Sequence, residues 1–398
     1  MTENQTAAER VVRGGTLDAM AALGQSRAPE PVQRFRYPDG HVGWLVTGHA
    51  LVRAVLADPR FSSRAELKRT PVHRPGAEPF IGRPAPPGWF IDLDPPDHTR
   101  FRRLLAGQFT LRRMNALRPG IERIVGEQLD ALERAGEPAD LVERFALPVP
   151  LRVICELLGV PATEHETVRR ESTSLLSLAA TAEDGATALE HLTELFRTLI
   201  GHKRGRPGDD VLSGLVSSGE LSDEEVAGAC VLLLTAGHET VASALGLGTL
   251  VLLCHEEQLA VLRDGTTSAH AAVEEFLRYL PVFHVGIPRG ALEDVELGGR
   301  PIRAGDTVTL MLPAANRDPG RFGDPEELDL ARGGTGHIAF GYGVHQCIGQ
   351  HLARIEMRIG FAELLRRFPG LRLAVRTEEI FLSRNGIACG VHRLPVTW

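Results

Sequence analysis

The chain of 398 residues has only 5 cysteines, and their arrangement excludes two classes of small fold. The number is odd and no two cysteines form a CxxC pair, which argues against a zinc ribbon and a disulfide-stapled scaffold. We therefore expect a reducing, cytoplasmic compartment. Hydrophobic residues make up 43% and charged residues 24%, as in ordinary globular proteins, so a disordered or collagen-like chain is excluded.

A basic excess is also absent. The chain carries 44 basic and 51 acidic residues, a net charge of −7, which disfavours nucleic acid as a partner. The first residues, MTENQTAAERVV, contain no basic stretch followed by an apolar one, so we expect no signal peptide. The sequence shows no internal repeat of fixed period, which excludes solenoids and propellers.

Only one long hydrophobic run occurs, at residues 226–254. His238 and Glu239 lie at its middle, and a charge at the centre of a bilayer costs about 2.5–3.5 kcal/mol. We therefore predict that this run forms a long buried helix of a soluble protein, with no membrane association.

The periodicity of apolar residues predicts a mainly α protein with a minor β part. Short strands are expected around a Pro-Asp-Gly turn at 34–47 and around a Gly-Gly turn at 293–310. Helical spacing dominates residues 98–255 and returns at 269–280 and 350–367. Length alone suggests two or three domains.

Local signals mark helix starts and loops. Asp97 immediately precedes an expected helix, and Ser222 with Glu225 matches a capping box before the long apolar helix. Residues 203–210 indicate an exposed linker, the best candidate for a domain boundary. Residues 70–96 contain eight of the 26 prolines and predict a long ordered loop, a feature that is usually functional.

The segment GHIAFGYGVHQCIGQHLAR, residues 336–354, places Cys347 after a glycine-rich loop and at the start of a helix. The positive end of the helix dipole lowers the pKa of a thiol at this position. The glycines let the backbone lie against a flat, bulky ligand, because they lack a Cβ atom. Three interpretations remain open: a buried structural cysteine, a nucleophile with His345 as its base, and a thiolate ligand of haem.

The segment FGYGVHQCIG resembles the haem-binding signature of the cytochromes P450, F-x-x-G-x-x-x-C-x-G. Phe340, Gly343, Cys347 and Gly349 all match the signature. The resemblance implies haem b as cofactor, with Cys347 as the ligand of its iron and Gly349 among the residues that contact it. It also implies a cytochrome P450-type domain built around a buried haem.

Residues 236–240, AGHET, resemble the oxygen-activation motif of the same family, A-G-x-[DE]-T. A threonine inside a helix can donate to the carbonyl four residues earlier, here that of Ala236, and so open a polar notch in an apolar wall. The resemblance implies that Glu239 and Thr240 are catalytic and supply protons for O–O cleavage. Without the resemblance, Glu239 would be a buried, paired acid of a core helix. Many members of the family carry Asp in place of Glu239 and Thr in place of Val241.

Charged residues extend the resemblance. The family's structural Glu-Arg-Arg network corresponds to Glu275, Arg278 and Arg332. The two propionates of haem need cationic partners. The positions that match the family's propionate partners are His98, Arg102, Arg289 and His345. Taken singly, each of these bases would be an ordinary surface residue.

The resemblance also outlines a substrate pocket of mostly small, apolar side chains. Its matching positions are Leu232, Thr235, Ala236, Val285, Ile287, Ile387 and Ala388. The proline-rich loop is expected to cover this pocket with Phe80, Trp89 and Phe90. The expected substrate is a bulky hydrophobic natural product, such as a macrolide, a polyketide or a terpenoid.

The implied reaction inserts one oxygen atom from O2 into this small molecule by hydroxylation or epoxidation. No glycine-rich phosphate loop is evident, so electrons from NAD(P)H would arrive through an external ferredoxin and ferredoxin reductase. Between residues 98 and 121 the chain has no acid and six arginines, at positions 100, 102, 103, 112, 113 and 118. This basic patch predicts a docking surface for an acidic ferredoxin.

We expect a monomer in which residues 1–398 form one domain, because the implied haem contacts run from His98 to His345 and must meet at one cofactor. Two alternatives from other classes remain. One is a non-catalytic haem- or ligand-binding protein, and the other is a cysteine-dependent hydrolase.

Overall fold

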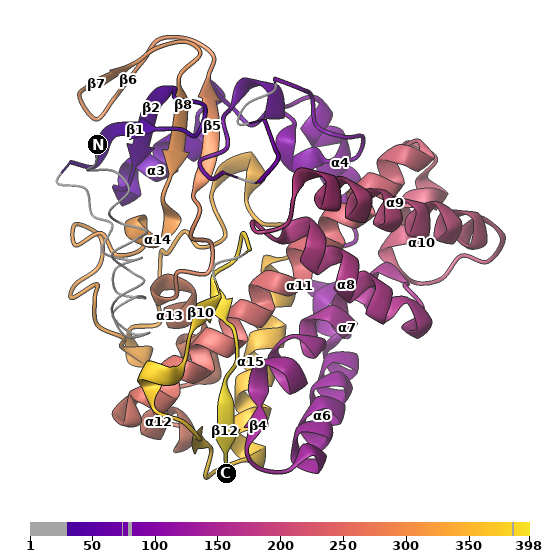
Figure 1. The fold of residues 1–398 in the computed structure, drawn as a ribbon, viewed down its shortest axis with the longest axis vertical. Helices are drawn as coiled ribbons and strands as arrows, with labels where there is room; N and C mark the ends of the chain where they lie inside the picture. Colours follow the sequence, from indigo (N-terminus) through magenta and orange to yellow (C-terminus); the bar gives the residue numbers. More distant parts are fainter. Residues whose placement is uncertain (1–29, 74, 79–81, 384–385) are drawn as a thin grey trace.

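Helices account for most of the chain in this computed structural model, which describes residues 30–73, 75–78, 82–383 and 386–398 (Figure 1). The α-helices are α3 (His49–Ala57), α4 (Asp97–Ala106), α5 (Leu111–Ala116), α6 (Arg118–Ala135), α7 (Pro148–Leu158), α8 (His165–Leu176), α9 (Ala182–Gly205), α10 (Val211–Ser218), α11 (Asp223–Cys254), α12 (Glu256–Arg263), α13 (Ala269–Tyr279), α14 (Leu312–Ala315) and α15 (Gln350–Arg367). The strands form small sheets at the upper left and lower centre of Figure 1, so the predicted mainly α class with a minor β part is confirmed.

The described strands form one five-stranded sheet and three smaller ones. The large sheet has the order β1 (Val32–Arg36), β2 (Val42–Val46), β8 (Thr307–Leu310), β5 (Ile287–Ala291) and β3 (Phe61–Ser62). The small sheets pair β4 (Ala139–Asp140) with β12 (Pro395–Thr397) and β9 (Arg372–Leu373), β6 (Val295–Leu297) with β7 (Arg300–Ile302), and β10 (Leu382–Ser383) with β11 (Gly390–Val391). The two strand pairs predicted around the Pro-Asp-Gly and Gly-Gly turns are both confirmed. Gly298 and Gly299 have φ of +55° and +75°, values that favour glycine in the second turn.

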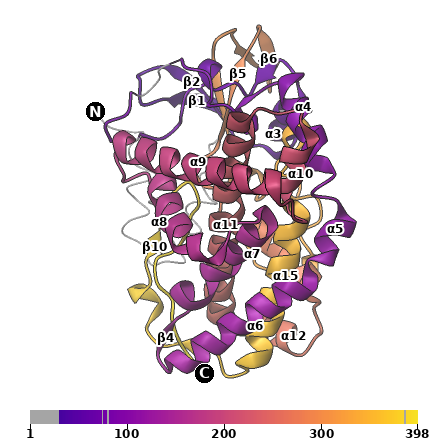
Figure 2. The same cartoon turned by 90° about the vertical axis from the view of Figure 1, so that its right-hand side faces the viewer.

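The long apolar helix α11 crosses the molecule and contacts α7, α9 and α15 (Figures 1 and 2). Its capping box is confirmed, because Ser222 Oγ accepts from the backbone of Glu225 and the Glu225 carboxylate accepts from the backbone of Ser222. The helix is long and apolar enough to cross a membrane, but 72% of its most apolar window is buried inside the protein. The predicted buried core helix is therefore confirmed.

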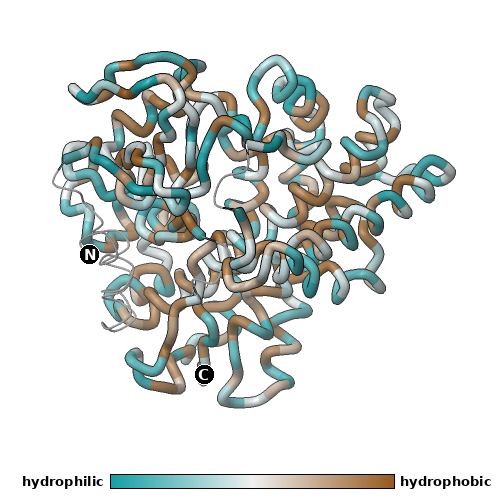
Figure 3. The backbone as a smooth tube through the Cα atoms, turned by 45° about the horizontal axis from the view of Figure 1, so that its top comes forward, coloured by the Kyte–Doolittle hydropathy of each residue, from teal (hydrophilic) through white to brown (hydrophobic). Residues whose placement is uncertain are grey.

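One apolar core contains residues from position 90 to position 396, and a second lies against the large sheet. Hydrophilic stretches predominate in the peripheral loops (Figure 3). The exposed linker predicted at 203–210 is confirmed in part: residues 204–209 are exposed and the segment connects α9 to α10, but its first residues continue α9 and Asp210 is buried. Lys203 Nζ lies 2.5 Å from Asp210 Oδ2, and Asp210 Oδ1 accepts from Ser213 N at 2.7 Å at the start of α10. The segment is thus fixed by an ion pair and a helix cap.

The proline-rich loop packs directly onto α11. A Cβ atom at Gly228 would lie 1.9 Å from the carbonyl oxygen of Pro87, so only glycine permits this approach. Phe90 is buried and stacks on Phe101 of α4, with ring centroids 5.9 Å apart, so it belongs to the core and not to a cover over a pocket. Trp89 is partly buried against the same core, and Phe80 lies outside the described residues.

The start of α4 differs from the prediction. Its N-cap is Pro96, which makes no side-chain hydrogen bond, and Asp97 lies in the first helical turn. An acid at that position still interacts favourably with the helix dipole.

Candidate active site

Cys347 lies between a short 3-10 helix, Gly343–His345, and the first turn of α15. Its backbone N–H donates to the carbonyl of Phe340 at 2.9 Å and closes the loop. Gly341 and Gly343 have φ of +69° and +73°. A Cβ atom at Gly343 would lie 2.4 Å from the carbonyl oxygen of Leu56, so this glycine is needed for contact with α3 and not only for a flat ligand.

Two opposing effects act on the sulfur of Cys347. Burial raises the pKa of its thiol, whereas the backbone N–H groups of Gly349 and Gln350 and the charges of Arg102 and Arg354 lower it. The residue nevertheless has an accessible surface, so the sulfur is surrounded by protein yet open on one side. This combination suits a sulfur that binds a cation, because a bound metal favours the thiolate further.

The imidazoles of His98 and His345 are in contact, with ring centroids 4.0 Å apart and their planes tilted by 39°. His98 Nδ1 and His345 Nε2 are both buried without a hydrogen-bond partner. Burial and the neighbouring charges of Arg102 and Arg289 lower the pKa of His98 to about 4 and that of His345 to about 2. Burial also lowers the pKa of Arg289 to about 10.

Asp92 and Asp94 act on this cluster without pairing directly with it, since their charges partly offset the lowering of the pKa of Arg289, and Asp94 does the same for His98. Among the described residues, no carboxylate forms an ion pair with His98, Arg102, Arg289 or His345. Arginine charges without an ion-paired acid, beside imidazoles without hydrogen-bond partners, favour an anionic ligand at this place. Two unpartnered imidazole nitrogens and two guanidinium groups beside a thiolate fit a ligand that carries two carboxylates and a metal. Haem has that composition, and the residues present fit it.

Lys68 extends the cluster and was not predicted from the sequence. Its Nζ lies 2.5 Å from Asp92 Oδ1, burial lowers the pKa of the amine, and its charge acts on His345. It is one of only two lysines in the chain, and the other, Lys203, also forms a shielded ion pair. That scarcity is the only sequence signal that marks Lys68.

His345 does not act on Cys347 as a base would. Its ring faces His98, and no hydrogen bond joins it to the sulfur among the contacts of the described residues. The interpretation of Cys347 as a nucleophile therefore has no geometric support.

The predicted back-bond in α11 is confirmed, because Thr240 Oγ1 donates to the carbonyl of Ala236 at 3.1 Å. Ala236 is exposed in a helix that is otherwise almost wholly buried, so this turn faces an accessible space. Burial raises the pKa of Glu239 to about 7. No described side chain pairs with the Glu239 carboxylate, so the alternative of a paired core acid is wrong.

The positions predicted to contact substrate come from three segments. Ala236, Val285, Ile287 and Ile387 are accessible in part, whereas Leu232, Thr235 and Ala388 are buried. An antiparallel bridge between Phe283 and Ala388, and a hydrogen bond of 2.8 Å from Cys389 N to Val282 O, hold two of these segments side by side. The third segment, on α11, contacts β11, which follows Ala388 in the chain.

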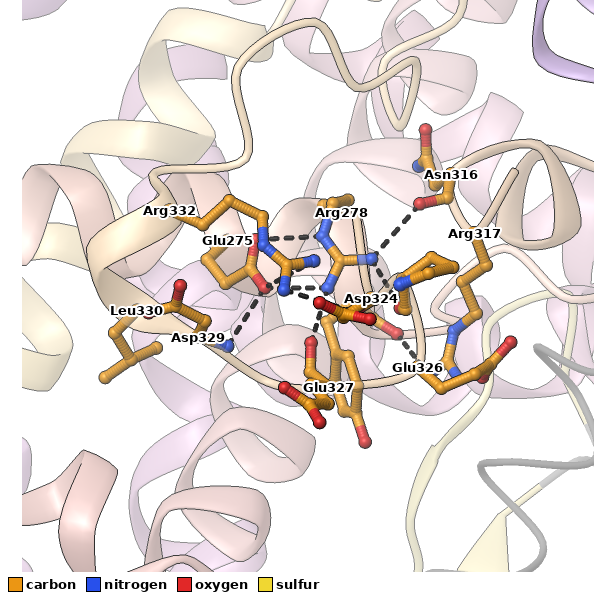
Figure 4. Close-up of polar contacts among 12 residues, drawn as sticks. Glu275, Arg278, Asn316, Arg317, Asp324, Glu326, Glu327, Asp329, Leu330 and Arg332 are labelled. Atoms are coloured by element: carbon orange, nitrogen blue, oxygen red, sulfur yellow. Dashed lines mark hydrogen bonds and ion pairs between the residues drawn. The ribbon is translucent and has the colours of Figure 1, made fainter. Parts of the chain in front are cut away.

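Glu275 and Arg278 of α13 are fully buried and joined by two hydrogen bonds, of 2.7 and 2.8 Å (Figure 4). Arg278 also donates to the backbone carbonyls of Asn316, Pro325 and Glu327. Arg332 approaches Glu275 at 3.9 Å, so the three residues form the predicted network.

The basic patch predicted from six arginines is largely neutralised. Its ion pairs join Arg100 to Glu225, Arg103 to Glu220, Arg113 to Asp209 and Arg118 to Glu122. Arg102 acts on Cys347 instead. Arg112 is exposed and has no carboxylate partner among the described residues. The prediction of an uncompensated patch is therefore wrong, because acids from distant segments reach it.

Comparison with known proteins gives a consistent result. The sequence model of the family described as Cytochrome P450 matches residues 203–388. Cytochrome P450 105C1 of Streptomyces sp is 44% identical over 399 residues and covers 100% of both chains. Pentalenic acid synthase of Streptomyces avermitilis is 42% identical, covering 96% of this chain and 94% of its own. The crystal structure of CYP105P1 in complex with filipin I superposes with a TM-score of 0.87 at 42% identity, covering 96% of this chain and 95% of that one.

Proposed function

This chain belongs to the cytochrome P450 family, and we propose that its substrate is a bulky hydrophobic natural product. It is a haem monooxygenase that draws electrons from redox partners, and the non-catalytic alternative is not supported. The observation that carries the assignment of the haem site is the position of Cys347 beside a cluster of bases, none of which forms an ion pair with a described carboxylate.

We assign the haem contacts to residues of this cluster. Cys347 is the iron ligand, held by the N–H groups of Gly349 and Gln350. His98, Arg102, Arg289 and His345 bind the two propionates, which supply the missing negative charge. Haem b, when bound, supplies the site at which O2 is reduced and one of its atoms is transferred.

Glu239 and Thr240 are the proposed proton-transfer residues. Glu239 can hold a proton near neutral pH, because burial without a cationic partner raises its pKa to about 7. Thr240 exposes its hydroxyl at the accessible turn of α11 and keeps its own proton engaged with Ala236. The pair can therefore pass protons from the protein interior toward a molecule bound beside this turn.

The proposed substrate class follows from the walls of the site. The seven predicted positions carry apolar side chains except Thr235, whose hydroxyl donates to Val231 O at 2.8 Å and is not free to bind substrate. Leu232 and Ala388 are buried behind this wall, and Ala236, Val285, Ile287 and Ile387 form its accessible part. Such a surface selects hydrophobic molecules, macrolides, polyketides and terpenoids among them.

We propose that NAD(P)H electrons arrive through ferredoxin reductase and ferredoxin. Four of the six arginines are paired with acids of this chain, so they are not available to ferredoxin. We therefore assign the ferredoxin contact to Arg112 together with Leu111, whose surface is 56% exposed. Arg112→Gln should slow reduction by ferredoxin severalfold at low ionic strength and little at high ionic strength. The exposed, internally paired Arg376 is the matched control, and equal rates for Arg112→Gln and the unmodified enzyme would contradict the assignment.

We further propose that the enzyme is a cytoplasmic monomer and that residues 1–398 form one domain. Support comes from the apolar core, whose members extend from position 90 to position 396 with no separation at the segment 203–210.

Turnover in labelled dioxygen tests the reaction and the substrate class together. The purified protein is supplied with NADPH, ferredoxin and its reductase, and a panel of hydrophobic natural products is screened first by spectral shifts on binding. A product that gains one labelled oxygen atom, absent with Cys347→Ala, supports the proposal. Binding and oxidation only of small polar molecules would contradict the substrate class.

A further inference from the structure

A second acid of α13, Glu274, connects three elements that surround the Cys347 loop. Its carboxylate accepts from Arg354 Nε at 2.6 Å and Nη2 at 3.0 Å, and from His337 Nε2 at 3.1 Å. Burial favours the neutral acid, but the hydrogen bonds from His337 and Arg354 outweigh it and lower the pKa of Glu274 to about 2. Glu274 is therefore ionised and fully engaged at physiological pH.

Arg354, whose positive charge is opposite to that of Glu274, lies beneath the Cys347 loop. It lies on α15, seven residues after Cys347, and its Nη1 donates to Gln350 Oε1 at 3.0 Å. Its guanidinium carbon lies 4.5 Å from the ring centroid of Phe340, within the range of a cation–π contact. The same charge favours the thiolate form of Cys347, so Arg354 acts electrostatically on the sulfur.

His337 ties the other end of the loop to the same carboxylate. Its Nδ1 accepts from the backbone N–H of Ala339 at 3.1 Å, so the proton of a neutral ring resides on Nε2 and is donated to Glu274. Phe340 follows directly and accepts from Cys347 N at 2.9 Å. Both ends of the loop thus depend on one partly buried acid.

We propose that Glu274 is a positioning residue that fixes Arg354 beneath Cys347 and balances its charge, and that this pair sets the reduction potential of the haem. The inference rests on the proposed function, in which Cys347 ligates the iron. It concerns neither the Glu275–Arg278 network on the same helix nor the proton-transfer residues of α11.

The charge balance fixes the sign of each effect. Reduction adds one electron to the ferric iron, so an uncompensated cation nearby favours the ferrous state and an uncompensated anion opposes it. Glu274→Gln leaves Arg354 unbalanced and should raise the potential. Arg354→Gln leaves Glu274 with only the weaker ion pair to Arg358, at 3.8 Å, and should lower it. The double variant removes both charges and should return close to the unmodified value.

A potentiometric titration of the purified holoenzyme with dithionite as reductant tests this inference. Each single variant should change the equilibrium constant for reduction about tenfold, in opposite directions, which is ~59 mV for a one-electron couple. Glu363→Gln is the matched control. Glu363 lies on α15, the helix of Arg354, and forms an ion pair with Arg366 at the surface. Its potential should not move.

Shifts in the same direction, or single variants that match Glu363→Gln, would overturn the inference. Arg354→Lys keeps the charge and serves as the test if Arg354→Gln fails to retain haem. The reduction potential of Arg354→Lys should stay near that of the unmodified enzyme. A shift as large as that of Glu274→Gln would also contradict the inference. Failure of the proposed function is distinguishable, because the unmodified protein would then lack the thiolate-type spectrum before any variant is compared.

Discussion

Thr240 differs from the other threonines of α11 in its surroundings and not in its hydrogen bond. Thr235, Thr240 and Thr249 all donate to a carbonyl four residues earlier, at 2.8, 3.1 and 2.8 Å. Thr235 and Thr249 are buried, whereas Thr240 lies at the accessible turn. The back-bond could be predicted from the sequence because it is local, but the exposure that gives it a function depends on packing.

Removal of the Thr240 hydroxyl should uncouple the reaction. Thr240→Ala is expected to retain haem and to divert electrons into hydrogen peroxide, lowering product per NAD(P)H about tenfold or more. The Thr240 oxygen would no longer accept and position the proton that Glu239 supplies, and positioned proton transfer contributes roughly 10²–10⁴-fold. Thr249→Ala removes an equivalent back-bond away from the site and should leave coupling unchanged. Peroxide and product are measured per NAD(P)H consumed, and full coupling in Thr240→Ala would exclude the assigned role.

The raised pKa of Glu239 predicts a pH dependence. With a pKa of about 7, the carboxyl is protonated below this pH and can donate, and it loses the proton as the pH rises. Coupling should therefore be highest below pH 7 and fall through about pH 7. Glu239→Gln should be poorly coupled and lack this step. The measurement is product formed per NAD(P)H consumed, as a function of pH, in the unmodified enzyme and in Glu239→Gln. An identical pH profile in both proteins would show that another group titrates.

At the scale of elements, the contact between the proline-rich loop and α11 depends on one glycine. A Cβ atom at Gly228 would lie 1.9 Å from Pro87 O, whereas a Cβ atom at Gly246 would make an ordinary contact of 3.7 Å with Val142. The two glycines share one helix, so their helix propensities cancel in a comparison.

Alanine substitutions at these positions should have opposite effects on stability. Gly246→Ala should stabilise the fold by up to about 1 kcal/mol, because alanine is the better helix former. Gly228→Ala should destabilise it, because the loop must move away from α11. Midpoints of urea unfolding give the comparison, and equal midpoints for the two variants would mean that the loop contact has no effect.

Elements set by short-range patterns were predictable from the sequence. The bounds of the last helix, the capping box at Ser222 and the Gly-Gly turn all depend on residues within one or two turns of one another. The linker at 203–210 was predicted too long, because its first residues continue α9. The arginine patch was not predictable in this way, since Glu225 and Glu220 lie more than a hundred residues away from Arg100 and Arg103.

At the scale of the whole molecule, the site collects side chains from α4, α11, the Cys347 loop before α15, the strand β5 and the C-terminal segment. The resemblance identified most of these residues, because the family's motifs fix their order along the chain. It did not identify Lys68 or Glu274, whose importance appears only when burial and partners are known. Because segments so far apart in the sequence meet in a single cluster, the 398 residues surround one site and need not divide into two or three domains.

The most direct test of this account is the absorption spectrum of the reduced, CO-bound protein. The account predicts the red-shifted Soret band of a thiolate-ligated haem in the unmodified protein and in Cys254→Ala, a cysteine outside the site. It predicts loss of that band in Cys347→Ala. A Soret band without the red shift in the unmodified protein, or an unchanged band in Cys347→Ala, would contradict the central claim that Cys347 ligates the haem.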